Sequence, residues 1–304
     1  MNGVLVVDKP AGMTSHDVVR RLRRVCKTRR VGHAGTLDPM ATGLLLVAVG
    51  EGTRVVQFLV EGDKTYHGSL LFGAETDTQD AEGAITLTRP WQQLDNTVVS
   101  CVCQQMVGEL QQVPPMYSAI KIKGVALHRL ARQGLEVERE PRTVHIRSLA
   151  IENLTLPHLS FEVECSKGTY VRTLCQDIGR RLGSAAHLTS LRRIRSGSFS
   201  IEEAVTLDWL EAAEADAIKS RMLSVASALR DYPALEVTAE GQARLGHGIP
   251  PALAQLAVPT DCGEGQKVLL TRNRQALAMA KFAPSRIIEK RGDFELLRVF
   301  NSSD

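Results

Sequence analysis

Residues 31–50 read VGHAGTLDPMATGLLLVAVG. The end of this stretch, residues 44–49, is an apolar run between glycines, which predicts a strand buried on both faces. A loop with one carboxylate, Asp38, precedes the run, and Pro39 follows that acid. Taken alone, the pair is typical of a helix N-terminus, because Asp caps helices and Pro is favoured at the first helical position. The loop therefore raises the question of what a lone acid does there, with no metal-ligand pattern beside it.

The segments around this stretch carry both strand and helix patterns. Apolar runs predict strands at residues 3–7 and 66–72. Helical spacing predicts a helix after Thr14 or Ser15 and others at 98–110, within the basic segment 113–134, and at the end of a strand–turn–helix unit over 161–183. From about residue 236, short apolar runs separated by Gly, Pro, Asn and Asp predict a small all-β unit of about seventy residues.

Length and composition are those of a globular protein with a sizeable core. The chain has 304 residues, of which 43% are apolar and 23% are charged, enough for one large domain or a large and a small one. The cysteines form no CxxC pattern and are expected to be reduced thiols. The N-terminus lacks the features of a signal peptide, and no apolar stretch approaches the ~20 residues of a membrane span. We therefore expect a soluble, cytoplasmic protein.

Positive charge is concentrated in two runs although the net charge is only +3. Residues 20–30, RRLRRVCKTRR, hold seven basic groups and no acid, and residues 191–197 read LRRIRSG. A run of this kind is often only a solvated helix face. Two such runs in a nearly neutral chain favour a polyanionic partner such as nucleic acid.

Several common kinds of site are excluded by their missing motifs. The chain has neither a GxxxxGK[ST] phosphate loop nor a GxGxxG turn between a strand and a helix. The acidic residues 75–83, ETDTQDAEG, lack the spacing of an EF-hand. No segment has the pattern of a nucleophile elbow. Nucleotide binding, calcium binding and triad hydrolysis are therefore not expected.

Five blocks along the chain together resemble the motifs of the bacterial tRNA pseudouridine synthase B family, which isomerises the uridine of the tRNA TΨC arm. In order, these blocks are GVLVVDKPAGMTSHDVV, VGHAGTLDPMATGLLLVAVGEGTR, DKTYHGSLLFGAETDTQDAEG, PPMYSAIKIKG and SKGTYVRTL. The resemblance covers roughly residues 3–200, and the tail from about 236 matches more loosely. One departure is His128, where the family commonly has a tyrosine.

The resemblance implies an α+β pseudouridine synthase fold, with a mixed, largely antiparallel sheet flanked by helices. The catalytic domain would span residues 1–235, and an insertion at 113–145 would close on the RNA. Residues 236–304 would form a small PUA-like β domain that adds RNA contact.

By resemblance, Asp38 is the catalytic residue, a nucleophile that attacks either C6 of the base or C1′ of the ribose of uridine 55. The reaction involves neither redox chemistry nor phosphoryl transfer, so no cofactor and no metal are expected. The acid must stay ionised, and the family pattern implies Arg172 as the cation that lowers its pKa. Tyr66 would stack on the flipped-out base and help remove the proton from C5.

The resemblance also implies supporting roles for further residues. Tyr170 and Leu191 would complete the wall of the base pocket, and His33 would pack into the opened RNA loop. Supporting contacts would come from Lys9, Pro10 and Asp80. The expected partner is the TΨC arm of tRNA, with no membrane and no obligate protein partner. Two other interpretations stay open: a tRNA-binding folding chaperone and a guide-RNA-dependent pseudouridylase.

Overall fold

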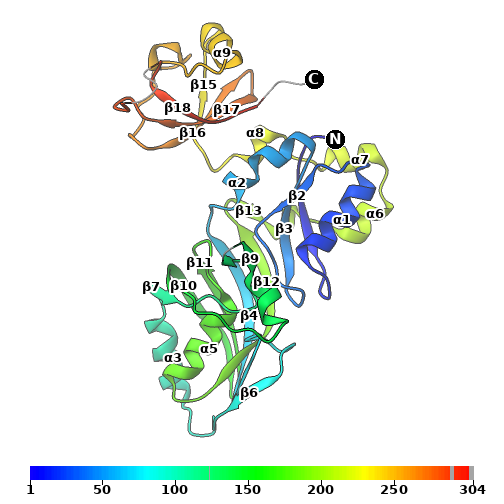
Figure 1. The fold of residues 1–304 in the computed structure, drawn as a ribbon, viewed down its shortest axis with the longest axis vertical. Helices are drawn as coiled ribbons and strands as arrows, with labels where there is room; N and C mark the ends of the chain where they lie inside the picture. Colours follow the sequence, from blue (N-terminus) through cyan, green and yellow to red (C-terminus); the bar gives the residue numbers. More distant parts are fainter. Residues whose placement is uncertain (123, 288–290, 301–304) are drawn as a thin grey trace.

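The computed structural model describes residues 1–122, 124–287 and 291–300, and its largest feature is a ten-stranded sheet (Figure 1). In spatial order its path is β14 (Val205–Thr206), β1 (Gly3–Lys9), β3 (Thr42–Val49), β12 (Ala186–Ser196), β4 (Lys64–Phe72), β11 (His158–Cys165), β10 (Arg142–Thr155) and β7 (Gly108–Gln112). β2 (Val31–Ala34) pairs with β3, and β13 (Phe199–Ser200) pairs with β12. β1 pairs in parallel with β14, and β3 with β12, whereas the other pairs are antiparallel. The predicted mixed, largely antiparallel α+β fold is confirmed.

β3 is buried on both faces, as its apolar run predicts. Alternate side chains of a strand point to opposite faces. Leu45 and Val47 accordingly pack into one apolar cluster with helix α1 (Ser15–Val25), while Leu44 and Leu46 pack into a second cluster with α2 (Val56–Leu59) and α8 (Val225–Ala228). The strand thus joins two cores, which fixes the position of the loop that precedes it.

The predicted first helix is α1. Thr14 caps it, and Asp17 completes a capping box with the Thr14 backbone. Val18, Val19 and Leu22 are buried on its inner face, which leaves most of its arginines on the outside. α5 (Val171–Arg181) follows β11, as predicted, and Gly183 after it has a φ of +69°, typical of a glycine that ends a helix. α5 packs on β12, and α3 (Asn96–Gln105) packs on β10 (Figure 1).

Two helix predictions were too long. The helix predicted over 98–110 ends at Gln105, because residues 108–112 form β7 and pair with β10. In the described residues of the segment 113–134 the only helix is the short α4 (Leu127–Ala131), which follows the two-residue strands β8 (Lys121–Ile122) and β9 (Val125–Ala126). In both segments, hydrogen bonds to a neighbouring strand replace those of a helix.

A second, four-stranded sheet lies near the C-terminus, apart from the large one (Figure 1). Its strands are β15 (Ala234–Glu236), β16 (Lys267–Arg272), β17 (Gln275–Phe282) and β18 (Phe294–Val299). The all-β prediction for this region was incomplete, because α9 (Ala239–Gly246), capped by Thr238, follows β15. Leu269 and Met279 share an apolar cluster with Ala228 and Leu229 of the α8 region.

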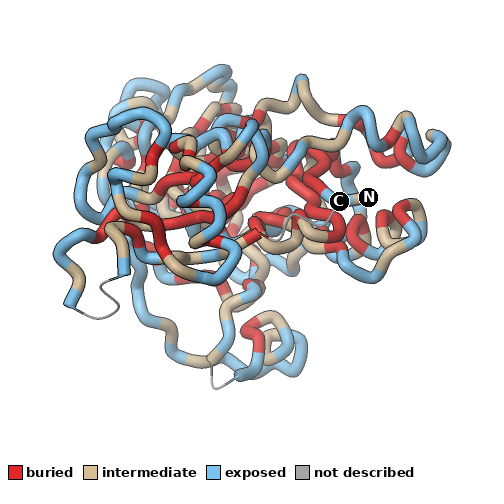
Figure 2. The backbone as a smooth tube through the Cα atoms, turned by 90° about the horizontal axis from the view of Figure 1, so that it is seen from above, coloured by how far each residue is buried: buried red, intermediate tan, exposed pale blue. Residues whose placement is uncertain are grey.

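Buried backbone runs through the middle of the molecule, with exposed loops at its margin (Figure 2). In the described residues, no helix is long and apolar enough to cross a membrane.

Candidate active site

The loop that carries Asp38 is fixed from below by contacts with β1 and α1. The Ser15 hydroxyl accepts a hydrogen bond from the Leu37 amide (2.8 Å) and donates one to the Leu37 carbonyl (3.1 Å). The buried Lys9 ammonium donates to the carbonyl oxygens of Met13 (2.7 Å) and Pro39 (3.3 Å). No helix follows Asp38, since residues 38–41 form a bend that leads into β3. The acid is therefore not a helix cap.

The Asp38 carboxylate forms an ion pair with Arg172, the second residue of α5. The Arg172 Nε lies 2.8 Å from Asp38 Oδ2, and Nη2 lies 3.1 Å from Oδ1. The guanidinium is almost fully buried and also donates to the carbonyl oxygens of Thr78 (2.7 Å) and Tyr117 (2.9 Å). Arg172 thereby ties Asp38 to two other loops of the site.

The ionisation of Asp38 is set by opposing effects. Burial raises the pKa of its carboxyl above the ordinary value, the charges of Arg172 and Lys9 lower it, and the charge of Asp80 raises it. Arg172 lowers the pKa, as expected, but the net direction is upward because desolvation outweighs the ion pair, so the pKa does not fall below its ordinary value. The Asp38 side chain is still 32% exposed, so screening by solvent limits this effect.

A cavity of about 500 Å³ lies beside Asp38. Five of the predicted site residues line it: Asp38, Tyr66, Tyr170, Arg172 and Leu191. Tyr66 lies on β4 and Leu191 on the neighbouring strand β12, whereas Tyr170 immediately precedes α5. Arg142 and Lys167, both exposed, also line the cavity. The structure therefore brings a carboxylate, two aromatic rings and several cations together around one cavity, whose lining includes both polar and apolar side chains.

The other predicted residues lie around the cavity but do not line it. Lys9 and the exposed Pro10 are at the end of β1, below the Asp38 loop. Asp80 is buried; its Oδ1 accepts hydrogen bonds from the Thr78 hydroxyl (2.6 Å) and the Glu82 amide (3.1 Å), and its Oδ2 lies 3.9 Å from Arg172 Nε. His33 is half-buried on β2. Burial, Arg193 and His16 lower its pKa.

The departure from the family pattern, His128, lies in α4. Its Nδ1 is 3.0 Å from the Ser118 carbonyl oxygen, and its amide donates to the same oxygen. His128 therefore holds together the segment that contains Ser118, and Ser118 lines the cavity.

The basic run at 20–30 was expected to have no acid to pair with, but the fold brings acids to it. Arg21 pairs with Glu211 (3.3 Å) and Arg30 with Glu51 (2.5 Å), while Arg20 pairs with Asp17 on the same helix. Arg24 and Arg29 are exposed, and no acid of the described chain pairs with either. The free positive charge of this surface is thus smaller than the sequence indicates.

The second basic run, 191–197, is not a continuous charged surface. It forms part of β12, where Arg192 pairs with Asp8 (2.7 Å) and Arg193 is only 1% exposed. Arg193 and the buried Lys64 both line the cavity, although neither was predicted to belong to the site. Successive side chains of a strand point to opposite faces, so a strand prediction for this run would have placed Arg192 and Arg193 on opposite faces of the sheet.

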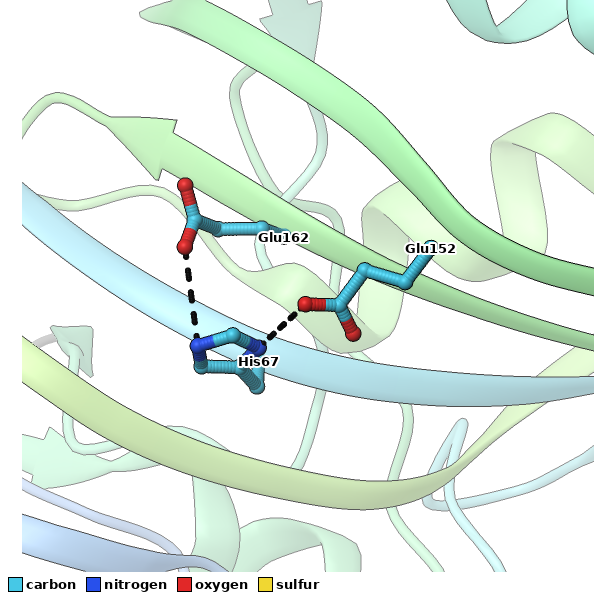
Figure 3. A group of neighbouring side chains, drawn as sticks. All are labelled: His67, Glu152 and Glu162. Carbon is cyan, nitrogen blue, oxygen red and sulfur yellow. Dashed lines mark ion pairs between the residues drawn. The ribbon is translucent and has the colours of Figure 1, made fainter.

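One group of described side chains has the composition of a metal site: His67, Glu152 and Glu162. His67 neighbours Tyr66 on β4, so it lies on the opposite face of the sheet from the cavity. Its Nδ1 is 2.6 Å from Glu152 and its Nε2 is 3.5 Å from Glu162, so the ring lies between two carboxylates (Figure 3). Each carboxylate faces a different ring nitrogen, so His67 bridges the two glutamates, and one ligand atom from each of the three side chains lies within 4.8 Å of the others.

Comparison with known proteins identifies the class of this chain. Residues 23–171 match the family model of the TruB family pseudouridylate synthase (N terminal domain), and residues 172–231 match that of the tRNA pseudouridylate synthase B C-terminal domain. A solved structure of a Cbf5-Nop10-Gar1 complex contains a similar chain, with a TM-score of 0.75 and 26% identity, over 98% of this chain and 84% of that one. The fold and the family models define a pseudouridylate synthase.

Individual relatives narrow this class. The tRNA pseudouridine synthase B of Syntrophotalea carbinolica is 54% identical over 301 residues, covering 99% of this chain and 98% of that protein. The protein of the same name from Geobacter sulfurreducens is 43% identical over 304 residues, covering 99% of this chain and all of that protein (100%). The chain therefore belongs to the TruB family of pseudouridylate synthases.

Proposed function

We propose that this protein isomerises uridine 55 in the TΨC loop of tRNA to pseudouridine, with Asp38 as the nucleophile. Its membership of a family of pseudouridylate synthases makes it an isomerase, and the names of its relatives identify tRNA as the substrate. The observation that carries the proposal is the Arg172–Asp38 ion pair at the edge of a cavity lined by Tyr66.

In the proposed reaction, the Asp38 carboxylate adds to the flipped-out uridine, either at C6 of the base or at C1′ of the ribose. The N1–C1′ bond breaks, the base turns, and C5 bonds to C1′. The proton then leaves C5, N1 takes up a proton in its place, and Asp38 is released as the carboxylate. Atoms balance without a co-reactant, since the product is an isomer of the substrate. Arg172 keeps Asp38 ionised and orients both of its oxygens.

The cavity lining is suited to a flipped-out base. Tyr66 and Tyr170 offer aromatic surfaces, and each stacked base adds about 1–3 kcal/mol of binding. Leu191 closes the apolar wall. Arg142 and Lys167, exposed at the cavity, are placed to contact the phosphates on either side of the base. Asp80 and Lys9 act indirectly, by fixing Arg172 and the Asp38 loop.

We further propose that residues 1–235 form the catalytic domain and residues 236–304 a PUA-like domain that adds RNA contact. His33 would pack into the opened RNA loop, and the segment 113–145 would close over it. No cofactor, metal or protein partner is part of the proposal, and the protein would work in the cytoplasm on tRNA alone.

The test is a turnover assay of the purified chain on an unmodified tRNA transcript, with the modified position mapped. Pseudouridine at position 55, formed by wild type and not by Asp38→Asn, is the expected result. Improved tRNA folding without isomerisation would instead show a chaperone. Isomerisation that occurs only after a guide RNA and protein partners are added would show a guide-dependent enzyme.

A further inference from the structure

Arg193 is a buried cation on β12. Its side chain is among the largest fully buried ones of the protein, at 1% exposure. In the described parts of the chain, no carboxylate lies within ion-pair distance of its guanidinium. Removing a charge from water is costly unless other groups replace the lost contacts. A neutral side chain would fill the same space without this cost, so the charge calls for an explanation.

The guanidinium is solvated by backbone carbonyl oxygens that lead to Asp38. Its Nε donates to Leu44 O on β3 (2.7 Å), Nη2 to Gly35 O (3.1 Å) and Nη1 to Thr36 O (3.5 Å). Gly35 and Thr36 are the residues that connect β2 to the Asp38 loop. One planar fork thus fixes both the strand after the catalytic loop and the start of that loop.

The backbone permits this approach because Gly43 has no Cβ, and the positive φ of Gly35 favours glycine there as well. Gly43 has a φ of +98°, and a Cβ at this position would lie 2.3 Å from the Arg193 carbonyl oxygen, so β3 and β12 could not come this close with another residue. Gly35 has a φ of +88°, and a Cβ there would lie 3.5 Å from Arg193 Nη1. The arginine and its loop are thus closely fitted to each other.

On its other side Arg193 faces Tyr66. The two residues are directly opposite each other in the pairing of β12 with β4, and the Arg193 Cζ is 6.0 Å from the centre of the Tyr66 ring. Burial raises the pKa of the Tyr66 hydroxyl, and the Arg193 charge and hydrogen bond oppose that rise. Arg193 is therefore connected both to the loop that carries the carboxylate and to the aromatic residue across the cavity.

We propose that Arg193 is a positioning residue of the isomerisation: from the base of the cavity it holds the Gly35–Thr36 backbone, and with it Asp38, at a fixed place relative to Tyr66. This inference depends on the proposed function of Asp38. A displacement of about 1 Å at a reacting group can lower a rate about 100-fold. Lysine should not replace the arginine, because its compact ammonium lacks the planar fork whose separate nitrogens reach carbonyl oxygens on β3 and on the loop at the same time.

The test compares Arg193→Met and Arg193→Lys with wild type in single-turnover assays at saturating tRNA, alongside binding isotherms and melting curves. We expect the single-turnover rate to fall about 100-fold for Arg193→Met and at least tenfold for Arg193→Lys. We expect Kd for tRNA to change by less than threefold in both. A role in stability alone would lower the melting temperature of the folded protein but not this rate.

Arg230→Met is the matched control. Arg230 also lies over an aromatic ring, with its Cζ 4.2 Å from the centre of the Phe199 ring, and pairs with Glu203 (2.6 Å), but it does not line the cavity. Its loss should lower the melting temperature and leave the rate within threefold of wild type. The inference is overturned if either folded Arg193 variant keeps a rate within threefold of wild type, or if Arg230→Met loses as much rate as Arg193→Lys.

Wild type and Asp38→Asn in the same assay separate this inference from the proposed function. Normal rates for the Arg193 variants, with an inactive Asp38→Asn, would reject the role of Arg193 and leave that of Asp38 in place. If wild type itself makes no pseudouridine at position 55, the proposed function fails first.

Discussion

Arg172 contacts both carboxylate oxygens of Asp38, although 134 positions of sequence separate them: Nε lies 2.8 Å from Oδ2 and Nη2 lies 3.1 Å from Oδ1. Asp38 is on the loop before β3 and Arg172 is in the first turn of α5. This contact combines a partly exposed acid with a buried cation, so the protonation of the acid depends on the arginine.

Replacing Arg172 by Met should move the acid limb of the pH–rate profile to higher pH. Asp38 reacts as the anion, so the rate falls as the pH drops through its pKa, which burial already raises. Loss of the Arg172 charge raises that pKa further. The measurement is the single-turnover rate at saturating tRNA between pH 4 and 8.

The control for this prediction is Arg180→Met. Arg180 lies on the same helix and pairs with Glu75 (2.6 Å), outside the cavity. Its loss should reduce stability and leave the limb in place. A limb that does not move in Arg172→Met would show that Asp38 is not the group that titrates.

Asp38→Asn should abolish turnover and preserve binding. Asn has the same size but is no anionic nucleophile. Phosphate contacts and stacking on Tyr66 remain, so Kd for tRNA should stay within about tenfold, or ~1.4 kcal/mol. A melting curve, a binding isotherm and a pseudouridine assay are measured on one preparation. Substantial turnover by a folded, tRNA-binding variant would exclude Asp38 as the nucleophile.

Salt dependence should distinguish paired from unpaired arginines of the 20–30 run. Each phosphate contact contributes about 0.9 to the slope of log affinity against log salt concentration. Removing Arg24 and Arg29 should therefore reduce the magnitude of the slope by up to about 1.8. Removing Arg21 and Arg30, which pair with Glu211 and Glu51, should reduce it by less than half as much. Equal effects of the two double variants would show that the ion pairs open when RNA binds.

Asp177→Asn should stabilise the protein at neutral pH. Burial raises the pKa of this half-buried carboxyl in α5 to about 6, whereas the unfolded value is about 3.9. Between these values the folded state binds more protons than the unfolded one, so stability falls as pH rises through this window and the loss is complete above it. Allowing for partial exposure, the variant should gain about 1–2 kcal/mol at pH 7.5.

The gain from Asp177→Asn should shrink as the pH falls and disappear only below the unfolded pKa of about 3.9, where the carboxyl is protonated in both states. Urea unfolding at pH 7.5 and at pH 4.5 measures this change, and the gain should be clearly smaller at pH 4.5. An equal gain at both values would show that the effect comes from packing and not from ionisation.

The sequence alone determined the strands and helices whose patterns are complete within a short segment. The apolar run of β3 identifies a strand buried on both faces, and the helical pattern after Thr14 or Ser15 marks the start of α1. The motif resemblance also specified the five residues that line the cavity, because each motif is a local stretch of sequence.

The tertiary structure decided whatever depends on contacts between distant segments. β7 replaces the end of a predicted helix because β10 pairs with it. Acids from elsewhere in the fold neutralise Arg21 and Arg30. Desolvation, which no local pattern encodes, sets the direction of the pKa shift of Asp38. Arg193 looks like a surface charge in sequence, and it is buried under the catalytic loop because β12 lies between β3 and β4.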